Sequence, residues 1–175
     1  MEITRRCDYA CRILRAAYQN GDSYISVADV AEQEGIPYSF ARSIQHDLAQ
    51  GGLIKTVRGA NGGLALNCDP AKVTVLDVLE VIQGPVSVSL CSSDPDFCDK
   101  QEGCAYNKLW LGADNLLQAY FSSITLKDLI EQGGDHPVVS LALSDSVLAP
   151  AVGSPFTVEG ESVRIEHPTA SSGER

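Results

Sequence analysis

Apolar side chains in the first fifty residues recur every three to four positions, which is the period of an α-helix. The pattern predicts three helices, over residues 4–20, 26–35 and 37–51, each opened by a capping residue or a proline and closed beside a glycine. Because the turn between the second and third helices is so short, they form a helix-turn-helix candidate. The apolar stripe of the third helix is predicted to consist of Phe40, Ala41, Ile44 and Leu48.

Two short apolar segments come next, at residues 53–57 and 64–66, and they favour β-strands. Asn61 and Gly62 between them are a strong signal for a hairpin turn, because both residue types tolerate the left-handed backbone that such a turn needs. The sequence therefore predicts a β-wing around the glycine-rich stretch RGANGG, residues 58–63.

The helical period then returns in three further segments. Thr74 opens a capping box for one helix, residues 105–122 form a long apolar pattern, and Thr125 caps a last short helix. The long pattern has a wide apolar face, so it needs a partner surface. Residues 133–175 are rich in Ser, Pro, Gly and Glu without any period, which predicts a disordered tail, although residues 138–143 could pack locally.

The chain has 175 residues and a net charge of −10, which argues against a nucleic-acid partner. The distribution of charge changes that picture, because residues 1–66 hold seven of the 13 basic and seven of the 23 acidic side chains. This neutral part can still bind phosphate if its basic groups share one face, although scattered solvated charges would give the same composition. No apolar run is long enough for export or membrane insertion, so we expect a cytoplasmic protein without a membrane partner.

Three of the six cysteines, Cys91, Cys98 and Cys104, lie in one segment between two predicted helices. Their spacings of seven and six residues are too wide for one helical face, so a loop would have to fold back to gather the sulfurs. Cytosolic cysteines stay reduced, which favours thiolate ligands over a disulfide framework. An iron–sulfur cluster, a zinc site and metal-free redox thiols all agree with this loop. The sequence contains no arrangement of a nucleophile and a base that would indicate an enzyme.

The order of the elements, the segment GGLIKTVRGANGGLAL at residues 51–66 and the three loop cysteines carry a resemblance to the Rrf family of bacterial winged-helix regulators. The resemblance implies a mainly α-helical fold with a small β-hairpin wing, and a homodimer that binds double-stranded operator DNA as a repressor. The expected parts are a winged helix-turn-helix DNA-binding domain at 1–84, a cluster-binding loop at 85–104, a dimerisation helix with a short C-terminal helix at 105–132, and the tail at 133–175.

The resemblance also implies an iron–sulfur cluster on the three loop cysteines, with a fourth ligand that differs among relatives. The iron–sulfur cluster regulator (IscR) uses a histidine three residues after its last cysteine, where this chain has Asn107, a poor iron ligand. The nitric-oxide-sensing repressor (NsrR) uses an aspartate of the partner subunit's first helix, and Asp8 occupies that place here. We therefore expect a 4Fe-4S rather than a 2Fe-2S cluster that senses nitric oxide, redox or iron status. An ordinary ion pair with Arg12 would also account for Asp8.

A helix-turn-helix presents the early residues of its second helix to the bases of the major groove. Arg42 is the sharpest candidate, because its guanidinium can bond one guanine twice or else pair with a phosphate. In the family the wing lies beside the minor groove, a use that Arg58 and its flanking glycines fit. The expected DNA-binding residues are Tyr38, Ser39, Arg42, Ser43 and Gln45 on the helix, with Arg58, Gly59, Asn61, Gly62 and Gly63 on the wing.

Overall fold

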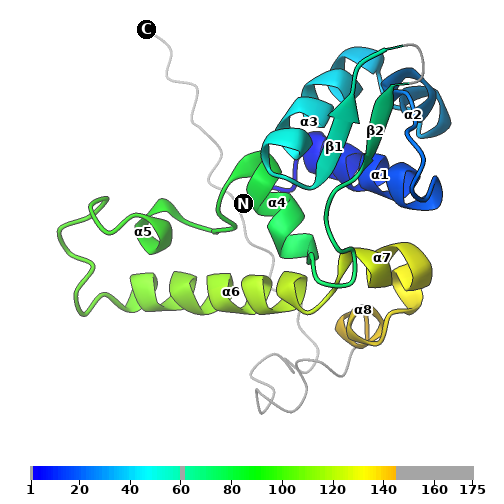
Figure 1. The fold of residues 1–175 in the computed structure, drawn as a ribbon. Helices are drawn as coiled ribbons and strands as arrows, with labels where there is room; N and C mark the ends of the chain where they lie inside the picture. Colours follow the sequence, from blue (N-terminus) through cyan, green and yellow to red (C-terminus); the bar gives the residue numbers. More distant parts are fainter. Residues whose placement is uncertain (1, 60–61, 145–175) are drawn as a thin grey trace, which may run out of the picture. The chain divides into compact units, whose positions relative to one another are not determined.

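Three helices pack against one another in the N-terminal half of the computed structural model, which describes residues 2–59 and 62–144 of the chain. A short turn joins the second helix to the third, so the helix-turn-helix expected from the sequence is formed (Figure 1). Ser26 begins the second helix by accepting a hydrogen bond from the backbone N–H of Asp29. The three helices are α1 (Arg5–Gln19), α2 (Val27–Gln33) and α3 (Tyr38–Gln50).

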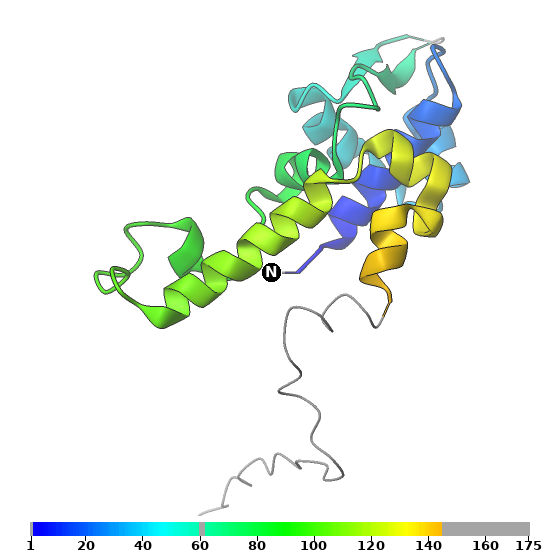
Figure 2. The ribbon, with the colours of Figure 1, turned by 90° about the horizontal axis from the view of Figure 1, so that it is seen from below.

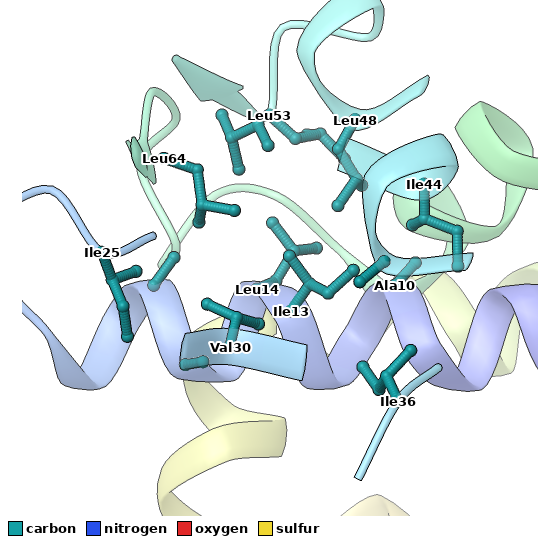
Figure 3. Close-up of a cluster of buried hydrophobic side chains, with 14 of the residues drawn as sticks. Ala10, Ile13, Leu14, Ile25, Val30, Ile36, Ile44, Leu48, Leu53 and Leu64 are labelled. Carbon is teal, nitrogen blue, oxygen red and sulfur yellow. The ribbon is translucent and has the colours of Figure 1, made fainter. Parts of the chain in front are cut away.

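One apolar core joins these helices, and Figure 3 shows its central side chains. Ala10, Ile13 and Leu14 of α1 are completely buried in the same cluster as Ile44 and Leu48 of α3. Burial of one leucine or isoleucine side chain contributes about 1.5–3 kcal/mol to folding. The core therefore fixes the position of α3 on α1.

Phe40 departs from the predicted apolar stripe of α3. Its side chain is 44% exposed, whereas Ala41, Ile44 and Leu48 are buried. The three buried positions form a narrow stripe, and Phe40 lies at its edge in the first turn of the helix. There the Phe40 ring packs edge-on against Tyr9 of α1, with ring centroids 6.1 Å apart. The prediction that Phe40 is a core residue is therefore wrong.

The hairpin after α3 is formed as predicted, by β1 (Ile54–Val57) and β2 (Gly63–Leu66) in antiparallel register. A bridge between Ile25 and Leu64 attaches β2 to the segment before α2. Gly63 is required at this contact, because a Cβ atom there would lie 2.2 Å from the carbonyl oxygen of Ile25. Backbone contacts thus hold the wing against the helix-turn-helix.

The second half of the described chain consists of short helices and one long helix, α6. Thr74 and Thr125 cap their helices through the predicted capping boxes. The segment with the three cysteines includes α5, a single turn that was not predicted and lies beside α6 (Figure 2). None of the helices in the described residues is long and apolar enough to cross a membrane. The bounds are α4 (Val75–Gln83), α5 (Leu90–Ser93), α6 (Ala105–Ser122) and α7 (Leu126–Gln132).

The segment expected to open a disordered tail is helical at its start. A 3₁₀ turn (η1, Gly133–Asp135) is followed by the short helix α8 (Pro137–Ala142). His136 between them is buried, and its Nδ1 accepts a hydrogen bond from the backbone N–H of Val138 at 3.3 Å. Elements this short leave no period in the sequence. Ordered structure therefore extends past residue 133, and residues 145–175 lie outside the described part of the chain.

Candidate functional site

A groove of about 340 Å³ lies between α3 and the wing strand β1. Tyr38, Arg42 and Gln45, three of the α3 residues expected to bind DNA, line this groove. Arg58 lines it from the wing, whereas Ser39 is exposed on α3 outside it. The described lining consists of Val27, Tyr38, Arg42, Gln45, His46, Ala49, Thr56, Val57 and Arg58.

The positive charges of this groove are not neutralised by any carboxylate of the described residues. Arg42 and Arg58 form no ion pair with any residue in the described part of the chain, and none of the described lining residues is acidic. A groove of this kind attracts phosphate. Three arginines of α1 are neutralised by carboxylates, in the pairs Arg6 with Asp47, Arg12 with Asp8 and Arg15 with Glu34.

Two side chains of α3 lie differently from expectation. Ser43 does not line the groove, and its hydroxyl accepts hydrogen bonds of 3.3 and 3.4 Å from the guanidinium of Arg6. His46 does line the groove, although it was not among the expected DNA-binding residues. Helical spacing was the available signal, since His46 follows Arg42 by four positions and so shares its face of α3.

The wing glycines have a structural explanation. Gly59 has a φ of +122°, a left-handed value that favours glycine. A Cβ atom at Gly62 would lie 2.2 Å from the carbonyl oxygen of Val57. Neither glycine lines the groove, and Asn61 lies outside the described residues. Turn geometry and close backbone packing therefore account for both glycines without a ligand.

The three loop cysteines lie in one segment, but they differ in local structure and in exposure. Cys91 lies on α5 and Cys104 is the N-cap residue of α6, both half-buried, while Cys98 between them is exposed. In the described part of the chain, no three Cys, His, Asp or Glu side chains come close enough to bind one metal ion.

Two buried polar residues of α6 bind the start of the cysteine segment. Asn107 donates a hydrogen bond from its side-chain amide to the carbonyl oxygen of Cys91. Asp114 accepts hydrogen bonds from the hydroxyl of Ser92 and the backbone N–H of Val88. Burial raises the pKa of Asp114, but these hydrogen bonds outweigh it, so the pKa lies below the ordinary value of an aspartate. Asn107 thus serves the local backbone here.

Asp8, the expected fourth ligand, lies away from the loop cysteines. Its carboxylate is half-exposed and pairs with Arg12 at 2.8 Å, the ion pair that the sequence left open. A cavity of about 270 Å³ has Asp8 and Phe121 in its wall, near the end of α6 opposite to Cys104. Since a helix rises about 1.5 Å per residue, these two ends of α6 lie roughly 25 Å apart. Within one chain, Asp8 therefore does not join the loop cysteines.

The remaining cysteines pack in or against apolar clusters. Cys7 is buried, and its Sγ donates a hydrogen bond to Oε1 of Gln83 at 3.0 Å. Burial, with smaller contributions from Cys7 and Asp8, raises the pKa of Cys11 to about 11. Burial also raises the pKa of Cys68. The raised pKa values make Cys11 and Cys68 poor nucleophiles and poor metal ligands at neutral pH.

Comparison with known proteins adds a family to this geometry. A family model described as Rrf2, iron-dependent transcriptional regulator, matches residues 3–132. A putative HTH-type transcriptional regulator of Aquifex aeolicus is 28% identical over 130 residues, which cover 73% of this chain and 90% of that protein. The HTH-type transcriptional regulator IscR of Photorhabdus laumondii is 27% identical over 74% of this chain and 79% of its own length.

The solved structures include CymR, the global cysteine regulator of B. subtilis. It matches with a TM-score of 0.62 and 24% identity, over 74% of this chain and 96% of its own. This likeness concerns the fold, and it agrees with the predicted winged helix-turn-helix followed by a long helix.

Proposed function

The chain belongs to the Rrf2 family of transcriptional regulators, and we propose that it is a homodimeric repressor whose operator binding depends on an iron–sulfur cluster. As a member of this family it regulates transcription by binding DNA and is not an enzyme. The observation that carries the sensory part is the separation of the expected ligands, with Cys104 at one end of α6 and Asp8 near the other. Two chains together would complete such a ligand set.

A dimer through α6 supplies the required geometry. When two such helices pack antiparallel about a two-fold axis, the start of one lies beside the end of the other. Large apolar side chains of α6 are exposed in the single chain, and several such side chains on one helix favour a protein partner. They are Tyr106, Leu109, Trp110, Leu111 and Leu116, with exposed fractions between 37% and 74%.

DNA binding is assigned to the groove between α3 and the wing. Arg42 at the start of α3 would contact a guanine or a phosphate in the major groove, and Arg58 a phosphate or the minor groove. In a dimer the two α3 helices read half-sites about one helical turn, roughly 34 Å, or a multiple of it apart. The neighbouring His46 lies where it can add a phosphate contact.

The donor set fits an iron–sulfur cluster, because thiolates are the usual ligands of such clusters. Cys91, Cys98 and Cys104 would hold it together with the partner subunit's Asp8. When bound, the cluster supplies a centre that reacts with nitric oxide or oxidants, and the lack of a histidine at Asn107 favours the 4Fe-4S type. To bind, Asp8 must leave its ion pair with Arg12. This ties α1, which packs on α3, to the partner's loop and so couples the two sites.

Anaerobic purification of the full chain tests this function directly. We expect iron and inorganic sulfide near four of each per chain for a 4Fe-4S cluster, a brown colour, and tight operator binding that nitric oxide abolishes in a mobility-shift titration at fixed salt. Protein without iron and sulfide that binds stoichiometric zinc would refute the cluster. Operator binding that is indifferent to nitric oxide, oxidant and iron would refute the sensor.

A second candidate is a regulator that uses a zinc site or metal-free redox thiols. The exposure of Cys98 favours it, since an accessible thiol can be oxidised without a metal. The fold is also that of CymR, the global cysteine regulator of B. subtilis. The same preparation separates the candidates: a colourless protein whose operator binding changes when Cys98 is oxidised would favour this second function.

A further inference from the structure

The most buried positions of α6 are polar, whereas an ordinary amphipathic helix buries apolar residues. Its two buried residues are Asn107 and Asp114, and Gln118 is half-buried one turn further along. The three follow at intervals of seven and four residues, so they form one line along the helix, the polar stripe. His136 is the one other buried polar residue in the described part of the chain. A buried stripe of this kind requires a local explanation.

Asp114, the centre of the polar stripe, binds the segment around Cys91 at three points. Its carboxylate accepts hydrogen bonds from the backbone N–H of Val88 at 2.7 Å and from the hydroxyls of Ser87 and Ser92 at 3.1 and 2.5 Å. A carboxylate that is removed from water requires such donors, because burial without them strongly disfavours folding. The three bonds hold the segment in one conformation.

The outer residues of the polar stripe hold the two ends of the same segment. Gln118 donates a hydrogen bond from Nε2 to the carbonyl oxygen of Val86 at 3.2 Å. Asn107 donates one from Nδ2 to the carbonyl oxygen of Cys91 at 2.5 Å. Residues 86–92 are therefore bonded to α6 along their whole length, with Cys91 near the end.

Cys98 has no comparable support. The hydrogen bonds described for residues 95–103 all stay within residues 94–104, such as that from the backbone N–H of Gln101 to the carbonyl oxygen of Cys98. Its side chain is exposed. The two cysteines differ, therefore, in how firmly the metal-free chain holds them.

We propose that the polar stripe positions Cys91 before any iron binds, and leaves Cys98 to close onto a partly formed site. That Cys91 is a cluster ligand rests on the proposed function, whereas its positioning is a property of the metal-free chain. A ligand held in advance loses less conformational freedom on binding, which raises affinity. The Asn107 side chain is free to hold the carbonyl oxygen of Cys91, whereas a histidine at this position that served as an iron ligand would not be.

Site-specific alkylation of the reduced, metal-free full chain tests the proposal. Iodoacetamide modification of Cys91 and Cys98 is followed by peptide mass spectrometry. We expect Asp114→Ala to raise the Cys91 rate about tenfold, through loss of buried hydrogen bonds and easier local opening, without change at Cys98. Asp114→Asn keeps an acceptor for the N–H of Val88 and should give a smaller rise. Asn115→Ala, on the exposed side of α6, is the matched control and should change neither rate.

An unchanged Cys91 rate in an Asp114→Ala protein with native circular dichroism would overturn the positioning role. Equal rises at Cys91 and Cys98 would overturn it too, because they indicate general loosening. If Asp114→Ala does not fold, Asp114→Asn and Ser92→Ala each remove part of the bonding, and an unchanged Cys91 rate in both refutes the proposal. Reconstitution with iron and sulfide is measured separately. A wild type that takes up no iron refutes the proposed function while the alkylation result still decides the positioning.

Discussion

Helix α1 of the helix-turn-helix region, residues 4–66, and helix α6 of the sensory region, residues 86–122, differ in the kind of side chain that they bury. In the first, α1 buries Leu14 completely, as an amphipathic helix in a self-contained core should. In the second, α6 buries Asp114 and leaves Leu116 74% exposed. The first region has its core within one chain. In the second, Leu117 and Phe121 pack within the chain, but other large apolar side chains of α6, such as Leu116, stay exposed.

The largest effect that tests this comparison is expected from a truncation in the first region. Leu14→Ala should lower the free energy of unfolding by about 2–5 kcal/mol, because it leaves a cavity in a packed core. Leu116→Ala removes the same atoms from an exposed site and should change the stability of the single chain by less than about 0.5 kcal/mol. Urea unfolding at low protein concentration measures both. Equal losses would mean that Leu116 is a core residue and would end the contrast.

A charge on the apolar face of α6 should separate the subunits without unfolding them. Leu109→Asp with Leu116→Asp should weaken dimerisation on the order of 100-fold, since charges are strongly disfavoured at the centre of an interface. Sedimentation velocity gives the oligomeric state, and circular dichroism checks the fold. Asn115→Asp, an exposed neighbour, is the control. A double variant that still sediments as a dimer would assign the interface elsewhere.

Substitutions in the groove between α3 and the wing should weaken DNA binding without lowering the stability of the protein. Arg42→Ala or Arg58→Ala should weaken operator binding by about 1–3 kcal/mol and leave the unfolding transition unchanged, since neither side chain has a partner in the described chain. Mobility-shift titration at fixed salt measures the first effect. Arg15→Ala removes an arginine outside the groove and serves as the control. Operator binding as tight as that of the wild type in all three variants would exclude the groove as the DNA site.

Much of the fold could be predicted because its signals are local. The capping boxes at Thr74 and Thr125 form as expected, since each involves residues three apart. The helix-turn-helix and the hairpin follow from periodicity and turn chemistry. Phe40 was assigned wrongly because its burial depends on what α1 presents to it. The Tyr9 ring leaves it at the edge of the core, a contact that no pattern in α3 encodes.

The candidate site could be predicted only in part, for the same reason. Arg42 and Arg58 follow from the motif in which they stand, and both line the groove. The use of Asn107 and Asp114 could not be read from the chain, because polar positions in a helical pattern are expected to face solvent. Their partners lie 16 to 26 residues earlier, at Cys91 and Val88, so tertiary contacts decide the matter.

The smallest effect on the stability of the metal-free chain is expected at Asp8. This residue would connect the helix-turn-helix region of one subunit to the sensory region of the other. Its ion pair with Arg12 is exposed, so Asp8→Ala should cost less than about 1 kcal/mol of stability while it abolishes the cluster. Mixing Asp8→Ala with Cys98→Ser chains then tests the connection between subunits. Neither parent dimer has a complete ligand set, but each mixed dimer regains one if Asp8 binds across the dimer. Statistical exchange predicts about a quarter of the wild-type cluster content. No recovery in exchanged subunits would assign the fourth ligand to the same chain or to another residue, and the two regions would then be joined without Asp8.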